Sequence, residues 1–337
     1  MATSRELLGE VKKFIPPLLE KFHKGQAGRI AVIGGCEDYT GAPFFAAQAS
    51  TLLGVDMAHI ICEKAAGQVI KTYSPNLMVH PYMRDSKSLI PMSSTTPSTS
   101  TYLKDEILPP IYAMLGRLHV IVVGPGLGRD SLMLEIAKAV IVRAKELQLH
   151  IVLDADALFL VQNEPDVIKG YKRAVMTPNI VEFQRLCKAA GVALPEGFPE
   201  EKDTAKSACH ALAKAFNGPT IVAKGKIDYI SNGQSELMCD MPSGKKRVGG
   251  QGDTLSGTLS TFLAWKYAYQ SNIWKHDASL DEAKLMLLSA YGATSVTRYC
   301  SRAAFSKYGR SMLASNLSEM IGEAYTALFE DELKLHM

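Results

Sequence analysis

The amino-acid sequence predicts an α/β fold in which helices cover both faces of a central, mostly parallel β-sheet. Short apolar runs that resemble buried strands alternate with longer segments of helical spacing through most of the 337 residues. Such alternation is typical of βαβ units, whose strands lie parallel. No linker and no internal repeat divides the chain, so we expect a single domain over residues 1–337 with a surface insertion at about 84–105.

The expected elements follow one another along the chain. The first strand is RIAVIGG at 29–35, and the helix expected at 42–54 has Pro43 near its start and Gly54 as its C-cap. Further strands are expected at 58–62, 119–126, 150–157, 174–179 and 220–231, with helices at 131–148, 180–190 and 203–216. After Asp253 the pattern changes to helices alone, at about 254–270, 281–299 and 314–331.

Composition and charge limit the classes of function. The net charge is only +3, and the strongest basic cluster is GKKR at 244–247, so nucleic acid is not expected as a partner. The six cysteines form no C-x-x-C pair, which argues against a zinc site or a disulfide framework and suits a reducing compartment. The sequence shows no secretory signal and no run of about 18 apolar residues, so we expect a cytoplasmic protein without a membrane partner.

A glycine-rich segment at 249–257 leads directly into a predicted helix. Its spacing matches neither a dinucleotide-binding G-x-G-x-x-G nor a P-loop. A glycine turn before a helix can still form an anion hole from backbone N–H groups. From spacing alone, Asp253 is either the N-cap of this helix or a base that accepts the proton of a hydroxyl attacking a phosphoryl group. Gly257 is interpreted as a helix-packing residue.

Two polar residues follow the strand expected at 174–179. Asn179 and Glu182 can both face the carboxyl edge of the sheet, where α/β proteins bind ligands. Glu182 is either an acid that satisfies the helix dipole or, with Asn179, a ligand that holds Mg²⁺ through water.

Three further segments have structural interpretations, and the first also has a functional one. The glycines of 124–128 form either a truncated dinucleotide loop or a tight βα turn. By spacing, Lys224 and Asp228 are edge-strand charges on a strand that leads into an Asn-Gly hairpin. Asp154 and Asp156, at another strand end, are interpreted as helix caps.

Seven segments together resemble the ATP-dependent NAD(P)H-hydrate dehydratases of the ribokinase-like superfamily. In order, they are YTGAP (39–43), NLMVHP (76–81), GPGLGRD (124–130), LDADAL (153–158), TPNIVEF (177–183), KGKID (224–228) and GGQGDTLSG (249–257). The resemblance extends from about residue 25 to 325. G-G-x-G-D occurs across ribokinase-like kinases, whereas its combination with YTGAP and GPGLGRD is much more specific.

The resemblance implies a ribokinase-like fold and a hydro-lyase that repairs the S-epimer of hydrated NADH or NADPH. ATP, the co-substrate, phosphorylates the C6 hydroxyl, and elimination of phosphate restores the cofactor, because phosphate leaves far more easily than hydroxide. The products are ADP, phosphate and NAD(P)H, and Mg²⁺ is implied as the metal. The small-molecule substrate is the hydrated dinucleotide, and the sequence leaves the oligomeric state open, a homo-oligomer included.

The resemblance also implies the site residues. Asp253 is the base, and Gly250, Gln251 and Gly252 form the anion hole. The ATP-binding residues are Lys224, Gly225, Lys226, Ile227, Asp228, Ser243, Gly244, Lys245, Lys246, Arg247, Val248 and Gly249. The residues that contact the hydrated dinucleotide are Gly126, Pro178, Asn179, Ile180, Val181, Glu182, Phe183 and Gln184. Glu182 is also the implied metal ligand.

Several departures and alternatives stay open. Many bacterial relatives have His in place of Asn179, so the chain resembles the eukaryotic, ATP-using branch. The Lys245–Arg247 triplet suits a polyphosphate or is a solvated loop, and the Ser/Thr-rich 91–102 receives no function. One alternative function is a ribokinase-like kinase for a vitamin or sugar, which keeps the phosphate on its product. The other is a non-catalytic nucleotide-binding sensor.

Overall fold

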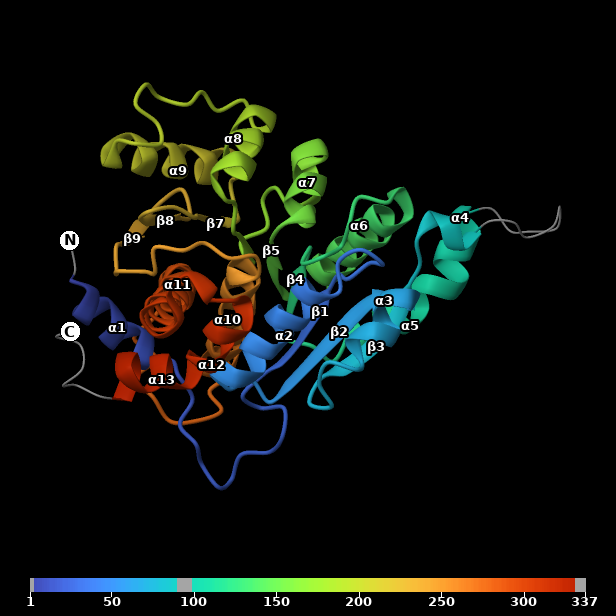
Figure 1. Ribbon diagram of the computed structural model, residues 1–337, viewed down its shortest axis with the longest axis horizontal. Coiled ribbons are helices and arrows are strands. Elements are labelled where there is room, and N and C mark those ends of the chain that lie inside the picture. Colours follow the sequence, from blue (N-terminus) through green and yellow to red (C-terminus); the bar gives the residue numbers. More distant parts are fainter. Residues whose placement is uncertain (1–2, 90–98, 331–337) are drawn as a thin grey trace.

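The computed structural model describes residues 3–89 and 99–330, and their strands form one sheet in the order β3-β2-β1-β4-β5-β6-β7-β8-β9 (Figure 1). The strands are β1 (Arg29–Ile33), β2 (Met57–Glu63), β3 (Met78–Met83), β4 (Val120–Val123), β5 (His150–Leu153), β6 (Ala174–Met176), β7 (Thr220–Ala223), β8 (Asp228–Ser231) and β9 (Glu236–Cys239). Neighbours from β3 to β7 pair in parallel, whereas β7–β8 and β8–β9 are antiparallel. The predicted mostly parallel sheet is confirmed.

Strand composition explains why the centre of the sheet is parallel. β4 and β5 read VIVV and HIVL and are buried along their whole length, as strands covered on both faces must be. Alternate residues of β1 serve opposite faces: Ile30 and Val32 belong to one core cluster, and Ala31 and Ile33 to the other. The order of strands reverses between β1 and β4, and the carboxyl edge of the sheet is therefore where a ligand crevice is expected.

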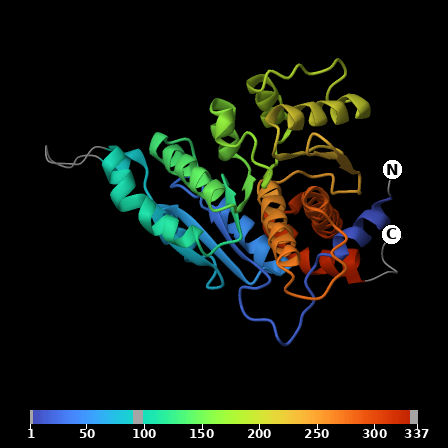
Figure 2. The same cartoon turned by 180° about the vertical axis from the view of Figure 1, so that it is seen from behind.

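Helices cover both faces of the sheet (Figures 1 and 2). One face packs against α1 (Ser4–Lys12), α2 (Gly41–Leu53), α3 (Lys64–Ile70), α10 (Gln251–Gln270), α11 (Glu282–Tyr308), α12 (Ala314–Glu319) and α13 (Ile321–Tyr325). The other face packs against α5 (Leu108–Leu115), α6 (Ser131–Glu146), α7 (Asp156–Asn163), α8 (Ile180–Ala189) and α9 (Lys202–Phe216). In the described part of the chain, no helix combines the length and apolarity needed to cross a bilayer.

Helix α10 is buried on nearly all sides because it packs against the sheet and between α2 and α11. A Cβ atom added at Gly257 would lie 2.1 Å from the carbonyl oxygen of Ala46 and 3.0 Å from Cβ of Ala49 in α2. The hydroxyl of Ser50, also in α2, donates to the Gly257 carbonyl at 3.0 Å. The packing role expected for Gly257 is therefore confirmed.

The structure corrects two of the expected elements and shows a strand, β3, that was not expected. The strand predicted at 220–231 is a hairpin, in which β7 and β8 pair antiparallel around a turn at 224–227. β3 was missed because Pro81 interrupts its pattern, yet an edge strand tolerates proline. The helix expected at 314–331 is broken into α12, α13 and a π-helical turn at Thr326–Glu330.

The Ser/Thr-rich segment lies partly outside the described residues, because residues 90–98 are not described. From residue 99 the chain is helical: α4 (Thr99–Tyr102), a π-helical turn at Leu103–Ile107, and α5. The remaining short elements are 3₁₀ turns at Ser86–Leu89, Pro165–Val167 and Gly309–Ser311.

Candidate active site

A cavity of about 950 Å³ lies at the carboxyl edge of the sheet, where β5, β6 and β7 end. Its wall combines the segments after these strands with the first turn of α10 and one side of α11. The lining includes Asp154, Asn179, Glu182, Phe183, Lys224, Gly252, Asp253, Thr294 and Arg298. Its size and its mixture of apolar and charged groups are typical of a small-molecule site.

Asp253 lies in the first turn of α10, as its third residue. The N-cap of this helix is Gly250, in a left-handed conformation with φ of 95° and no side-chain cap, so the N-cap interpretation of Asp253 is wrong. The first helical hydrogen bond runs from the N–H of Thr254 to the carbonyl of Gly250 at 3.0 Å. The N–H groups of Gly252 and Asp253 therefore have no helical acceptor, which is the geometry of an anion hole. The expected anion hole of Gly250, Gln251 and Gly252 is corrected in one respect, because the N–H of Gln251 already donates to the Val248 carbonyl at 3.3 Å.

The environment of Asp253 favours its protonated form. Burial, followed by the charge of Asp154, raises the pKa of Asp253 to about 7, against the opposing effect of Lys224. A carboxyl group with a pKa near neutrality can accept a proton at physiological pH and release it again. This property agrees with a general base rather than with a structural acid.

Asp154 was assigned only a capping role from the sequence, and this interpretation is wrong. Helix α7 follows Ala155, and no side chain caps it. Instead, Asp154 is 3% exposed. It accepts hydrogen bonds from Lys224 Nζ at 2.9 Å, from the N–H of Ala155 at 2.9 Å, and from the hydroxyl of Ser256 in α10. Asp154 thus brings Lys224 and α10 together beside Asp253.

The backbone next to Asp154 is strained. Ala155 has φ of 49°, a conformation that costs a residue with a side chain about 1–3 kcal/mol, and it lines the cavity. Lys224 follows an inner strand and pairs with a buried carboxylate, so it is not the edge-strand charge that its spacing suggested. A strand-end Asp after the apolar run at 150–153 was the only sequence signal for this cluster.

Asn179 and Glu182 form a capping box at the start of α8. The Asn179 side chain accepts from the N–H groups of Val181 and Glu182 at 3.0 Å each, and Glu182 Oε2 accepts the N–H of Asn179 at 2.8 Å. The helix-start interpretation of Glu182 is therefore confirmed. Burial raises the pKa of Glu182, and Lys224 and the Asn179 N–H oppose this rise.

Comparison with known proteins identifies the family. A family model described as NAD(P)H-hydrate dehydratase matches residues 30–323, nearly nine-tenths of the chain. The chain belongs to the NAD(P)H-hydrate dehydratase family. The resemblance seen in the sequence is thereby confirmed.

Curated members of the family are similar over almost their entire length. The ATP-dependent (S)-NAD(P)H-hydrate dehydratase of Neurospora crassa is 50% identical, over 97% of this chain and 95% of the relative. The protein of the same name from Schizosaccharomyces pombe is 45% identical, over 97% and 94%.

Solved structures support the ribokinase-like fold. A ribokinase-like superfamily protein from Enterococcus faecalis has a TM-score of 0.70 at 20% identity, over 98% of this chain and 96% of the other. The ADP/ATP-dependent NAD(P)H-hydrate dehydratase from Bacillus subtilis, co-crystallised with ATP/Mg²⁺, has a TM-score of 0.63 at 19% identity, over 95% and 97%.

In this dehydratase-family chain, most of the expected ATP-binding residues lie together. The cavity is lined by Lys224, Gly225, Lys226, Ile227, Asp228, Ser243, Arg247, Val248 and Gly249. Gly244, Lys245 and Lys246 are not among its lining residues. A Cβ atom at Gly244 would lie 2.4 Å from the Ser301 carbonyl, so Gly244 permits close packing on α11. Lys246 Nζ donates to the carbonyls of Arg310 and Met312, and so does not converge on the cavity.

The residues expected to contact the hydrated dinucleotide divide into two groups. The cavity is lined by Asn179, Ile180, Glu182 and Phe183, whereas Gly126, Pro178, Val181 and Gln184 are not among its lining residues. Gly126 lies in a turn where Gly124, Gly126 and Gly128 have φ of 120°, 63° and 75°, which agrees with the tight-turn interpretation. A Cβ atom at Gly126 would lie 2.6 Å from the Tyr39 carbonyl.

Asp228 provides a further correction. Instead of an exposed charge on an edge strand, it is 8% exposed and forms an ion pair with Arg298 of α11 at 2.7 Å. Nothing in the sequence distinguished Arg298 from other residues of the expected helix at 281–299.

Proposed function

We propose that this family member uses ATP to dehydrate the S-epimer of hydrated NADH or NADPH and releases ADP, phosphate and NAD(P)H. The observation that carries the proposal is Asp253, a carboxylate with a pKa of about 7 at the start of α10, beside free backbone N–H groups. The curated relatives described as ATP-dependent (S)-NAD(P)H-hydrate dehydratases support the choice of substrate.

The first step is transfer of the γ-phosphoryl group of ATP to the C6 hydroxyl of the hydrate. Asp253 accepts the hydroxyl proton as the oxygen attacks phosphorus, and ADP leaves. The N–H groups of Gly252 and Asp253, together with the helix dipole, stabilise the negative charge on the phosphoryl oxygens. Asp154 keeps Asp253 basic enough for this task because its charge raises the pKa of Asp253.

The second step removes the phosphate. The lone pair of the ring nitrogen next to C6 expels phosphate, and loss of a proton from C5 forms the C5–C6 double bond of NAD(P)H. The same anion hole that stabilises the transferred phosphoryl group can hold the departing phosphate. The net reaction removes one water from the hydrate and hydrolyses one ATP.

Mg²⁺ is the metal that we propose to accompany ATP. In proteins this ion is commonly held by one or two carboxylates together with substrate phosphates and water, and it neutralises phosphate charge. The carboxylate of Glu182 lines the cavity, which fits this donor set. Among the described residues, no three His, Cys, Asp or Glu side chains form a metal cluster. We assign Glu182, whose Oε2 also accepts the N–H of Asn179 at the start of α8, as the residue that would hold the ion through water.

The two substrates contact different walls of the cavity in this proposal. We assign ATP to the wall formed by Lys224–Asp228 and Ser243–Gly249, and the hydrate to the wall formed by Asn179–Phe183. Gly244 and Lys246 shape the ATP wall from behind through their contacts with α11 and with the segment at 310–312.

The decisive assay follows both products. The purified chain is incubated with ATP, Mg²⁺ and hydrated NADH, and the near-ultraviolet absorbance of the reduced nicotinamide is recorded together with free phosphate. We expect both to rise in equal amounts. A phosphorylated product without free phosphate would favour a ribokinase-like kinase, and ATP binding without turnover of either hydrate would favour a nucleotide sensor. Chelation of Mg²⁺ should stop the reaction.

The cytoplasmic location and the oligomeric state stay predictions. Cell fractionation and light scattering of the purified chain test them.

A further inference from the structure

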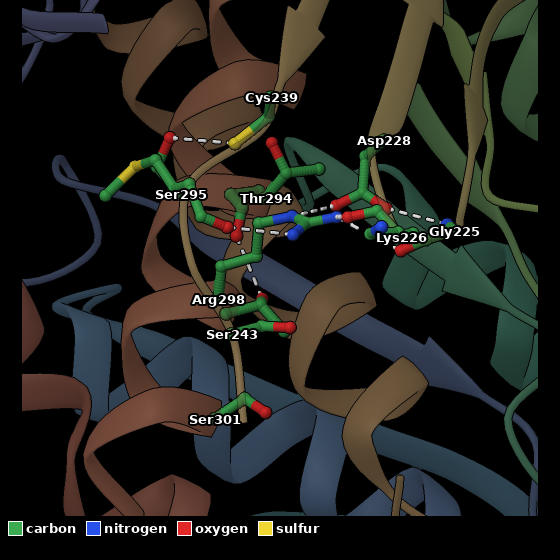
Figure 3. A network of polar contacts seen from close by, with 12 residues as sticks. Gly225, Lys226, Asp228, Cys239, Ser243, Thr294, Ser295, Arg298 and Ser301 are labelled. Atoms are coloured by element: carbon green, nitrogen blue, oxygen red, sulfur yellow. Dashed lines mark hydrogen bonds and ion pairs between the residues drawn. The ribbon is translucent and has the colours of Figure 1, made fainter. Parts of the chain in front are cut away.

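Helix α11 presents a polar stripe to the segments that we assign to ATP (Figure 3). Ser295, Arg298 and Ser301 follow one another at intervals of three residues and so lie along one face of the helix. Ser295 Oγ lies 3.7 Å from Cys239 Sγ at the end of β9, and Ser301 Oγ accepts the N–H of Gly244 at 3.2 Å. The stripe therefore follows the chain as it leaves β9.

Arg298, at the centre of this stripe, binds the Lys224–Asp228 segment of the proposed ATP wall and also Met241, two residues before the Ser243–Gly249 segment. Its Nε donates to Asp228 Oδ2 at 2.7 Å, and Nη2 donates to the carbonyls of Gly225 at 3.1 Å and Lys226 at 2.8 Å. Its Nη1 donates to the carbonyl of Met241 at 2.8 Å. Arg298 is only 5% exposed. One guanidinium thus joins the turn after β7 to the segment after β9.

The turn that Arg298 contacts is closed from within as well. The second oxygen of Asp228, Oδ1, accepts the N–H of Gly225 at 2.9 Å. Because a peptide unit is planar and its C=O and N–H point in opposite directions, the carbonyls that face Arg298 direct the N–H groups of Lys226 and Ile227 away from it. Successive N–H groups held in a turn are a recurring element of phosphate sites.

We propose that Arg298 is a positioning residue that assembles the ATP wall and thereby determines the affinity of the chain for ATP. The inference rests on the proposed function in one respect, the assignment of these two segments to ATP. Arginine suits the role because its planar group offers five donors in fixed directions, of which four are used here. A lysine has a single ammonium group and cannot reach all four acceptors in the same geometry.

A purely structural ion pair would behave differently. Loss of such a pair lowers the fraction of folded enzyme, which reduces the apparent kcat and leaves the KM for both substrates unchanged. Loss of a positioning residue for ATP raises the KM for ATP, leaves the KM for the hydrate unchanged, and spares kcat when ATP is saturating. The ratio of the two KM values therefore separates the two roles.

The test compares Arg298→Lys and Arg298→Met with the unmodified chain. Calorimetry measures the Kd for ATP, and steady-state kinetics give the KM for ATP and for hydrated NADH. We expect Arg298→Lys to raise the Kd and the KM for ATP about tenfold, with kcat at saturating ATP changed less than about threefold. Arg29→Met is the control, because Arg29 also donates to a carbonyl, that of Arg117, but at the start of β1.

The outcomes separate the inference from the proposed function. An unchanged Kd for ATP in folded Arg298→Lys, or an equal change in Arg29→Met, overturns the role of Arg298. If the unmodified chain does not bind ATP, both the inference and the proposed function fail. If ATP binding depends on Arg298 but the hydrate is not dehydrated, only the proposed function fails. Should Arg298→Met not fold, Arg298→Gln replaces it, since glutamine keeps a planar polar group but loses the charge and three of the five N–H donors.

Discussion

Asp253→Asn removes a charge from the cavity while keeping the size of the side chain, and we expect it to abolish turnover and to stabilise the fold. Burial and Asp154 raise the pKa of Asp253 from 3.8 to about 7 in the folded chain. A carboxyl group with a raised folded-state pKa contributes stability at low pH. That contribution is lost as the pH rises from the unfolded value through the folded value. Asparagine does not titrate and avoids this loss.

The size of the effect follows from the pKa. The folded-state pKa of Asp253 lies about three units above its unfolded value, which lowers the free energy of unfolding by about 4 kcal/mol once the pH exceeds 7. The dipole of α10 favours a negative charge in its first turn by about 0.3–1 kcal/mol, which offsets part of this cost. Residual contact with water offsets more of it. We therefore expect Asp253→Asn to raise the free energy of unfolding by about 1–3 kcal/mol at pH 8, and by less than about half of that at pH 5.

Urea denaturation at the two pH values measures this difference, and the product assay measures turnover. Asp156→Asn is the matched control, since Asp156 accepts the N–H of Gly128 and is not among the groups that shift the pKa of Asp253. If Asp253→Asn were less stable than the unmodified chain at pH 8, or gained the same free energy of unfolding at pH 8 and at pH 5, the account of Asp253 as a desolvated carboxyl group would be refuted. Retained turnover would refute its role as the base.

Two further predictions concern the same site and the helix that carries it. First, kcat/KM should fall about tenfold for each pH unit well below 7, following the protonation of Asp253, and Asp154→Asn should move this decline to lower pH. Superimposable pH profiles would contradict the electrostatic role of Asp154. Second, Gly257→Ala should lower the free energy of unfolding by about 1–3 kcal/mol, because the new Cβ would lie 2.1 Å from the carbonyl oxygen of Ala46. Gly9→Ala, at an exposed position of α1 with nothing within 4 Å of the new Cβ, should instead raise it by about 0.5–1 kcal/mol. Equal effects of the two substitutions in urea melts would show that packing against α2 is not the cause.

Local sequence patterns predicted the elements of the fold closely. The helix expected at 42–54 is Gly41–Leu53, with Gly54 at its C-cap in a positive φ of 123°. The helix expected at 180–190 is Ile180–Ala189. Such features depend on hydrophobic period, proline and glycine, all of which act between residues near one another in the chain. The hairpin of β7 and β8 was missed because residues 220–231 were interpreted as one strand, although the turn at 224–227 contains two lysines and a glycine.

The chemistry of the cavity depended on contacts that no local pattern contains. Asp154 and Lys224 are 70 residues apart, as are Asp228 and Arg298. From spacing alone, Asp154 and Asp228 had ordinary structural explanations, and Arg298 had no distinguishing feature. Their pairing arises because the parallel strands bring their carboxyl ends to one edge while α10 and α11 pack across the same sheet.

The sequence by itself determined the α/β class, the family, and the presence of a glycine turn with one acid before a helix. Each of these follows from residue order and local spacing. The tertiary structure alone decided that Asp253 lies inside the first turn of α10 and that its pKa is raised by burial and by Asp154. It also decided that Arg298 joins the turn after β7 to Met241, just before the second ATP segment. The reason is that burial and the distance between charges are properties of packed elements, and packing is decided by the whole sheet.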